Sequence, residues 1–227
     1  MMLEVCAFNI QSCFVAQKAG AGRIELCVDP QQGGTTPSYG LIHYVLEKIS
    51  IPSYPMIRPR GGNFVYDADE LAIMKKDILT CRELGSPGIA TGIQLPDGRI
   101  DTENLKRIVE WAYPMIVTCH KVFDATPDAF EALEDVIAAG CGRILTSGLH
   151  KTAAEGALVI SDLVAQAGGR IIIMPGGGVR SSNIAQLVAE TGAQEYHSSC
   201  LVSRATDFVA DEEEVKLIIK ELNTGKR

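Results

Sequence analysis

The sequence predicts a closed (β/α)8 barrel, the TIM-barrel fold, built from residues 1–227 as a single domain. Short apolar segments with strand character alternate with amphipathic segments at intervals of roughly 20–35 residues, the spacing of βα units in a parallel sheet. Glycine-rich stretches such as AGAGRIELCVD and AAGCGRILTSG recur where a helix should end and a strand begin. The length of 227 residues is also close to the roughly 250 residues of a typical barrel.

The expected elements follow in order along the chain. Strands are predicted over residues 2–8, 23–28, 54–60, 88–94, 115–121, 143–147, 171–175 and 194–199. Helices are predicted near residues 10–19, after Thr36-Pro37, over DADELAIMKKDILTCREL and DTENLKRIVEW, and after Thr126-Pro127, Thr152, Ser182 and Asp211. A threonine followed by proline is typical of a helix N-cap and its first residue. An open doubly wound sheet is the alternative fold, but it normally has GxGxxG after the first strand, where this chain has NIQSC.

Composition excludes several classes of function. The net charge of −7 argues against nucleic-acid binding, which needs a basic surface. The sequence has no run of about 18 apolar residues, so no membrane span is expected. The start MMLEVCAFNI lacks the basic segment of a signal peptide, so none is expected. The 7 cysteines form no CxxC pair, which favours reduced thiols in a cytoplasmic protein.

Polar side chains are expected inside the barrel. Because side chains alternate along a strand, Ile24 and Leu26 should face the helices while Glu25 and Cys27 point inward. The same alternation, applied to the other strands, directs inward Glu4, Cys6, Arg58, Arg60, Gln94, Thr118, His120, Ser147, Glu195, His197 and Ser199. Barrel interiors are normally filled with Val, Ile and Leu. The set therefore predicts either a structural ion-pair network or, as we favour, a functional site at the carboxyl ends of the strands.

A glycine-rich loop predicts an anion site. Gly176, Gly177 and Gly178 follow the seventh strand and lead toward a helix, so their backbone N–H groups can face an anion. A phosphate site in a barrel often uses the loops after strands seven and eight. We expect Arg60 and Ser147 to contribute, together with Arg58. The alternative is a tight turn that only needs positive φ angles.

Two thiols and several titratable groups are further candidates. Cys6 and Cys27 occupy matching Glu-x-Cys triplets on adjacent strands, about 4.8 Å apart, and could hold one soft cation such as Cu(I); the alternative is simple burial of two thiols. His120 and His197 are candidate general acids or bases, with Asp124 or Glu195 as orienting partners. The candidate catalytic set is Glu25, Arg58, His120, Glu195 and His197.

Seven motifs resemble the CutC family of copper homeostasis proteins: LEVCAFN, GAGRIELC, GGTTPSYG, MIRPRGG, RILTSG, MPGGGV and EYHSS. The resemblance implies a (β/α)8 barrel, a cytoplasmic homo-oligomer (a dimer or tetramer), and a role in copper handling with Cu(I) bound by Cys6 and Cys27 near the barrel mouth. The chain departs from the family pattern at Lys121, where TCHKVFD replaces TFHRAFD, and at Asn63, where an Asp is frequent. Lysine keeps the charge of arginine but loses its bidentate fork.

Two functional interpretations therefore stay open. One is a copper homeostasis protein that binds Cu(I) at its cysteines. The other is a barrel enzyme that acts on a small anionic or phosphorylated metabolite, which would explain the arginines and the glycine loop better.

Overall fold

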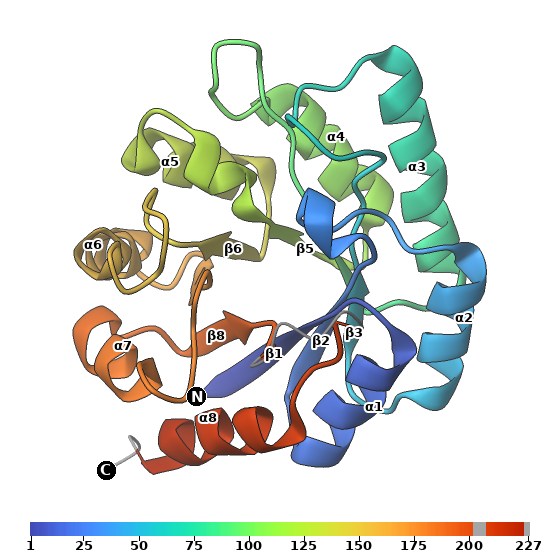
Figure 1. Ribbon diagram of the computed structural model, residues 1–227. Coiled ribbons are helices and arrows are strands. Elements are labelled where there is room, and N and C mark those ends of the chain that lie inside the picture. The colour runs from blue at the N-terminus through green and yellow to red at the C-terminus, as the bar shows by residue number, and fades with distance from the viewer. Residues whose placement is uncertain (202–207, 225–227) are drawn as a thin grey trace.

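The computed structural model describes residues 1–201 and 208–224, and within them eight strands alternate with eight helices. The strands are β1 (Met2–Ala7), β2 (Arg23–Leu26), β3 (Ser53–Pro55), β4 (Gly88–Thr91), β5 (Ile116–Cys119), β6 (Arg143–Thr146), β7 (Ile172–Pro175) and β8 (Glu195–Ser198). The helices are α1 (Ile10–Ala19), α2 (Tyr39–Lys48), α3 (Ala68–Glu83), α4 (Thr102–Ala112), α5 (Ala129–Ala139), α6 (Ala157–Ala167), α7 (Ile184–Thr191) and α8 (Glu212–Thr224). Two short 3-10 turns, η1 (Pro30–Gln32) and η2 (Lys121–Ala125), follow β2 and β5. The helices surround the strands in chain order (Figure 1), which confirms the predicted (β/α)8 barrel.

The ring of strands consists of two hydrogen-bonded halves. One half has the order β3-β2-β1-β8 and the other β4-β5-β6-β7, with parallel pairing throughout. A parallel bridge between Met56 and Ala90 joins β3 to β4. At the β7–β8 junction, the hydroxyl of Ser198, the last residue of β8, donates over 2.7 Å to the carbonyl of Val179 in the loop after β7. The glycine loop after β7 is thus tied to the end of β8.

Helices α2 and α5 begin later than the Thr-Pro pairs predict. Their N-caps are Ser38 and Asp128, whose side chains accept hydrogen bonds from backbone amides of the first turn. The Thr36 hydroxyl instead accepts from the Arg58 amide, and the Thr126 hydroxyl donates to a carbonyl of η2. Because both threonine hydroxyls are engaged outside the helices, a later residue provides the N-cap in each case. Helices α6 and α7 also begin later than expected.

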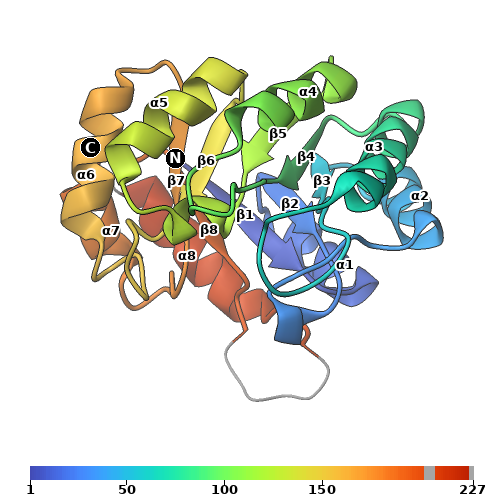
Figure 2. The ribbon, with the colours of Figure 1, turned by 90° about the horizontal axis from the view of Figure 1, so that it is seen from above.

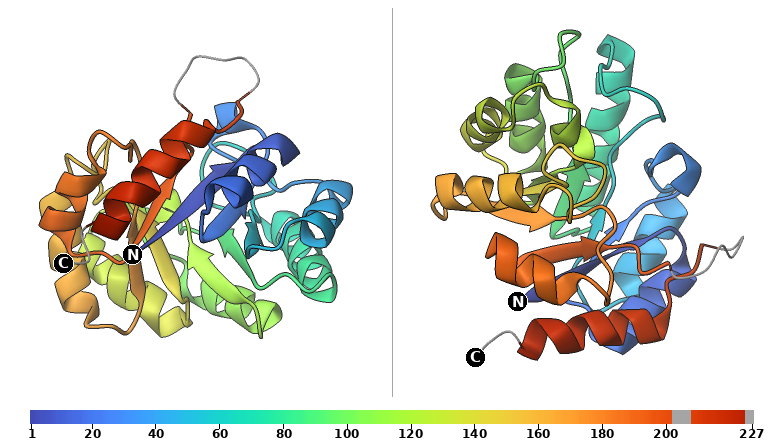
Figure 3. Two further views of the ribbon diagram at one scale, coloured as in Figure 1. Left: turned by 90° about the horizontal axis from the view of Figure 1, so that it is seen from below. Right: turned by 60° about the vertical axis from the view of Figure 1, so that its left-hand side comes forward.

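Apolar packing between strands and helices forms the core. Leu3, Val5, Ile24 and Leu26 are fully buried against the helices, as the alternation along β1 and β2 predicts. Neighbouring helices pack side by side around the barrel, as for α4 and α5 (Figure 2). Helix α8 lies along α1 (Figure 3) and completes the outer ring. No helix in the described part of the chain is both long enough and apolar enough to cross a membrane.

Gly88 at the start of β4 is expected to be intolerant of a side chain. A Cβ atom there would lie 2.4 Å from the Tyr54 ring and 2.6 Å from the Ile116 carbonyl oxygen. We expect Gly88→Ala to lower the free energy of unfolding by about 1–3 kcal/mol, measured by urea denaturation. Gly40→Ala is the control, because a Cβ at that helical position meets no atom within 4 Å; it should be neutral or stabilising. Equal effects of the two changes would contradict this account of the barrel packing.

Candidate functional site at the barrel mouth

A pocket of about 220 Å³ opens where the carboxyl ends of the strands meet. It is smaller than the roughly 300–1,000 Å³ typical of sites for drug-sized ligands, so it suits a small ligand. The structure brings together in its lining these residues predicted from the sequence: Cys6, Glu25, Arg58, His120, Gly177, Gly178, His197 and Ser199. Lys121 and Arg180 line it as well.

Glu195 lies in a different layer of the barrel and does not line the pocket. It is the first residue of β8 and pairs in register with Met2, at the amino-terminal end of β1. Its carboxylate contacts Arg23 Nη2 at 2.6 Å and Arg143 Nε at 2.7 Å, and Arg23 also pairs with Glu4. Glu195, predicted as a candidate catalytic residue, is therefore a member of a buried ion-pair network instead. Strand alternation places it inside, but its position at the start of the strand places it below the mouth.

Arg60 and Ser147 also lie outside the pocket. The Arg60 guanidinium forms an ion pair with Glu70 and donates to the carbonyls of Asn63 and Val65. Ser147 is fully buried behind the glycine loop, and its hydroxyl is 2.9 Å from Asp124 Oδ2. Neither side chain is available for the anion contact predicted from the sequence.

Gly176 precedes the two glycines that line the pocket, and its role is to allow close packing inside the barrel. Its amide donates to the Thr146 carbonyl, and a Cβ there would lie 2.3 Å from the Leu145 side chain. Only Gly177 and Gly178 of the predicted three-glycine cradle therefore face the pocket.

His197 stands between two carboxylates. Its Nδ1 lies 2.7 Å from Glu4 Oε1, and its Nε2 lies 3.8 Å from Glu25 Oε2. Burial by itself would lower the pKa of His197, but Glu25, Cys6 and Glu4 raise it well above its usual value, so the ring carries a positive charge. Burial would raise the pKa of Glu4, yet the hydrogen bond with His197 and the charge of Arg23 lower it to about 2. For Glu25, burial raises the pKa despite the opposing charge of His197.

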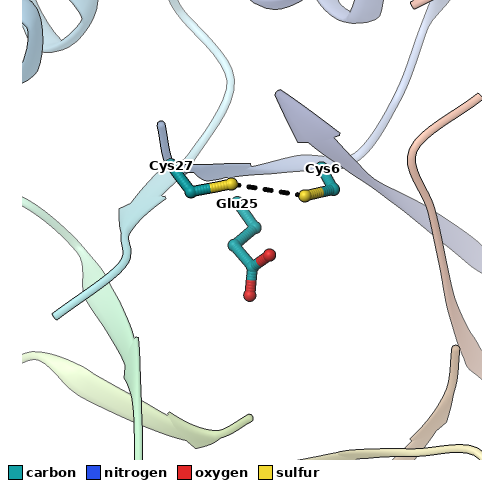
Figure 4. Close-up of side chains that lie close together, drawn as sticks. All are labelled: Cys6, Glu25 and Cys27. Carbon is teal, nitrogen blue, oxygen red and sulfur yellow. Dashed lines mark hydrogen bonds between the residues drawn. The ribbon is translucent and has the colours of Figure 1, made fainter. Parts of the chain in front are cut away.

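Cys6 and Cys27 form a close pair of thiols. The parallel register sets Cys6 beside Glu25, and the Sγ atoms of Cys6 and Cys27 lie 3.4 Å apart. Figure 4 shows the two sulfurs directed toward each other, with the Glu25 carboxylate extending beside them. The sulfurs and a Glu25 oxygen all lie within 4.8 Å of one another, a separation that one metal ion can bridge. Cys6 lines the pocket, whereas Cys27 is only 1% exposed and lies behind it.

Both thiols of this pair are protonated at neutral pH. The hydrogen bond with Cys27 and burial raise the pKa of Cys6 well above its usual value. The hydrogen bond with Cys6 lowers the pKa of Cys27, but burial and the Glu25 charge raise it by more. A metal that binds here as a dithiolate must displace both protons.

His120 is a neutral hydrogen-bond donor rather than a base held by Asp124. Its Nδ1 accepts a hydrogen bond from the Val122 amide at 3.1 Å, so the proton of the neutral ring is on Nε2, which is buried and has no partner among the described residues. The predicted orienting partner, Asp124, instead accepts hydrogen bonds from Thr146, Ser147 and Leu149. Burial and the charge of Arg58 lower the pKa of His120 to about 3.

We expect His120 to stay uncharged from pH 8 down to pH 5. Its pKa is lower in the folded state than in the unfolded state, so the neutral ring contributes fully to the free energy of unfolding above pH 6.5. This contribution is lost as the pH falls from 6.5 toward 3, because the unfolded state then binds the proton more readily. NMR of the ¹⁵N-labelled imidazole, assigned with a His120→Asn variant, measures the charge directly. A titration of this ring with a midpoint near pH 6.5 would show that it is not desolvated as described.

Comparison with known proteins identifies the family. The model of the CutC family matches residues 1–202. The chain belongs to the CutC family. A CutC family protein from Chromobacterium violaceum is 46% identical over 198 residues, covering 87% of this chain and 80% of the relative. One from Parabacteroides distasonis is 48% identical over 199 residues, covering 87% and 82%.

One solved structure supports the family assignment, and a second shows the shared fold. The CutC structure from Streptococcus agalactiae is 38% identical, with a TM-score of 0.83 over 88% of this chain and 99% of that chain. N-(5'-phosphoribosyl)anthranilate isomerase from Pyrococcus furiosus is 13% identical, with a TM-score of 0.64 and 99% of each chain covered, which shows a shared fold alone.

The site of this CutC family member thus offers three kinds of chemistry. The thiol pair provides soft ligands for a metal ion. The buried Glu25 carboxyl and the neutral His120 ring can accept and donate protons at a small ligand. Lys121 and Arg180 add positive charge at the mouth. The alternation of residues along the strands does not predict Arg180, because it lies in the loop after the glycines.

Proposed function

We propose that this protein binds Cu(I) between Cys6 and Cys27 and takes part in copper homeostasis. The observation that carries the proposal is the 3.4 Å separation of the two sulfurs. Two metal–thiolate bonds of about 2.3 Å span any sulfur separation up to about 4.6 Å, so one ion can contact both atoms without movement of the strands.

The ligand types favour Cu(I) over other ions. Thiolates are soft ligands that select Cu(I), whereas a closed structural zinc site normally has four ligands. The groups that could add a third ligand are Glu25, which is within reach of both sulfurs, and His197, which contacts Cys6. His197 is held by Glu4 and would have to release its proton first. We therefore assign the primary coordination to the two sulfurs.

The family relationship supports this assignment. The Streptococcus agalactiae relative carries the description "Putative Copper Homeostasis Protein CutC". The seven free cysteines, all buried, suit a reducing compartment such as the cytoplasm. The homo-oligomer expected from the family belongs to the same proposal, and light scattering after size-exclusion chromatography measures it.

The direct test is a competition titration of the reduced protein with a chromogenic Cu(I) chelator. We expect one equivalent of Cu(I) to bind, with release of protons from the two thiols. The apparent affinity should therefore rise as pH rises through neutrality. Binding that is independent of pH, or that never competes with the chelator, would contradict a dithiolate site.

A further inference from the structure

Two arginines that line the pocket, Arg58 and Arg180, have no carboxylate partner among the described residues, whereas the Lys121 ammonium lies 3.8 Å from Asp124 Oδ2. Arg58 is only 5% exposed, and its guanidinium donates to the carbonyls of Gln32, Gly34 and Gly62. Within residues 1–201 and 208–224, neither Arg58 nor Arg180 lies within ion-pair distance of a carboxylate. A buried cation without a partner is costly, so this wall of the pocket favours an anion.

The glycine loop presents backbone donors at the same wall. Gly177 and Gly178 have φ angles of 95° and 75°, a conformation that glycine adopts without strain. No hydrogen bond among the described residues is donated by either amide. The Lys121 ammonium reaches over this loop, since a Cβ on Gly177 would lie 3.5 Å from Lys121 Nζ. Two free amides beside a lysine form a suitable cradle for a phosphate group.

Two other residues of the pocket lining, Glu25 and His120, each have a buried polar atom without a partner among the residues that the structure describes. Glu25 Oε1, from β2, and His120 Nε2, from the end of β5, are buried and lack a hydrogen-bond partner in the described part of the chain. Both residues are 3% exposed, and both line the pocket. His120 Nε2 donates and the Glu25 carboxylate accepts, and a hydroxyl group of a ligand, which both accepts and donates, complements either atom.

We infer that the pocket binds a small phosphate monoester that carries a free hydroxyl group. The phosphate lies at Gly177, Gly178 and Lys121, and the hydroxyl lies at Glu25 and His120. The 220 Å³ of space limits the carbon skeleton to a few atoms. The site shares Glu25 with the surroundings of the thiol pair, but its phosphate donors are distinct from the sulfurs, so we expect the ester to bind without copper.

Isothermal titration of the metal-free, reduced protein with sn-glycerol 3-phosphate, inorganic phosphate and glycerol tests the inference. We expect the ester to bind most tightly, inorganic phosphate more weakly, and glycerol without detectable heat. Lys121→Ala should weaken binding of the ester and of phosphate by about tenfold to a hundredfold, the effect of one charge-assisted hydrogen bond. Glu25→Gln should weaken binding of the ester by about tenfold and leave phosphate binding unchanged.

Lys76→Ala, on the exposed face of α3, is the control for loss of one positive charge. It should leave both affinities unchanged, and thermal unfolding verifies that every variant is folded. Absence of ester binding to the wild-type protein would overturn the inference. So would equal losses from Lys76→Ala and Lys121→Ala, which would indicate a diffuse charge effect. A loss of phosphate binding in Glu25→Gln as large as the loss of ester binding would contradict the assigned orientation.

Discussion

Replacing Cys27 with alanine is expected to weaken Cu(I) binding by about a hundredfold or more. Loss of an outer-shell partner of a metal ligand already costs 10- to 100-fold in affinity, so loss of one of two sulfur ligands should cost at least as much. Cys27 lies behind the pocket lining, so the change removes a sulfur without altering the mouth. Cys6→Ala should have a similar effect, and the double variant should bind no Cu(I) at the site.

Cys141→Ala is the matched control. Cys141 is another buried free thiol, in the turn after α5, and its burial raises its pKa to about 12. Its loss should leave Cu(I) affinity unchanged, while its effect on stability should resemble that of Cys27→Ala. Full affinity in the variant lacking both Cys6 and Cys27 would refute the assignment of the metal site.

Replacing Arg23 with methionine is expected to lower the free energy of unfolding by about 3–5 kcal/mol, the cost of leaving buried charges unpaired. Arg23 lies between Glu4 and Glu195, and all three side chains are largely buried. The change would leave the Glu4 carboxylate with His197 alone. Chemical denaturation at neutral pH measures the loss. Arg170→Met, which removes an exposed ion pair with Glu134, should change the midpoint little.

The pH dependence separates this effect from simple loss of packing. Glu4 has a depressed folded pKa of about 2 against an ordinary value of 4.5, so its ionised form favours folding above pH 4.5. That contribution is lost as pH falls from 4.5 toward 2. The stability difference between wild type and Arg23→Met should therefore shrink in acid. A difference that stays constant over this pH range would indicate that Arg23 acts through packing alone.

The parts of the fold and of the site that can be predicted from the sequence are those that follow from the alternation of side chains along the strands. This alternation directs Glu25 inward and Ile24 outward, as observed, and it brings residues from distant strands to one pocket. It cannot by itself separate the layers of the barrel. Glu195 and His197 share one face of β8, yet Glu195 begins the strand and lies in the buried ion network, while His197 lies at the mouth.

Loop residues were harder to predict because alternation ends with the strand. Arg60 has the same parity as Arg58, but β3 ends at Pro55, and the chain beyond it turns Arg60 toward Glu70 at the start of α3. Asp124 lies near His120 in sequence, yet its carboxylate organises the loop after β6. The position of a residue relative to the strand end, more than its chemical type, decides whether it reaches the pocket.

Anomalous diffraction from crystals loaded with one equivalent of Cu(I), recorded above the copper edge, tests the central claim most directly. We predict a single strong peak between the Sγ atoms of Cys6 and Cys27, within bonding distance of both. A copper peak at any other place, with the two thiols left uncoordinated, would contradict it.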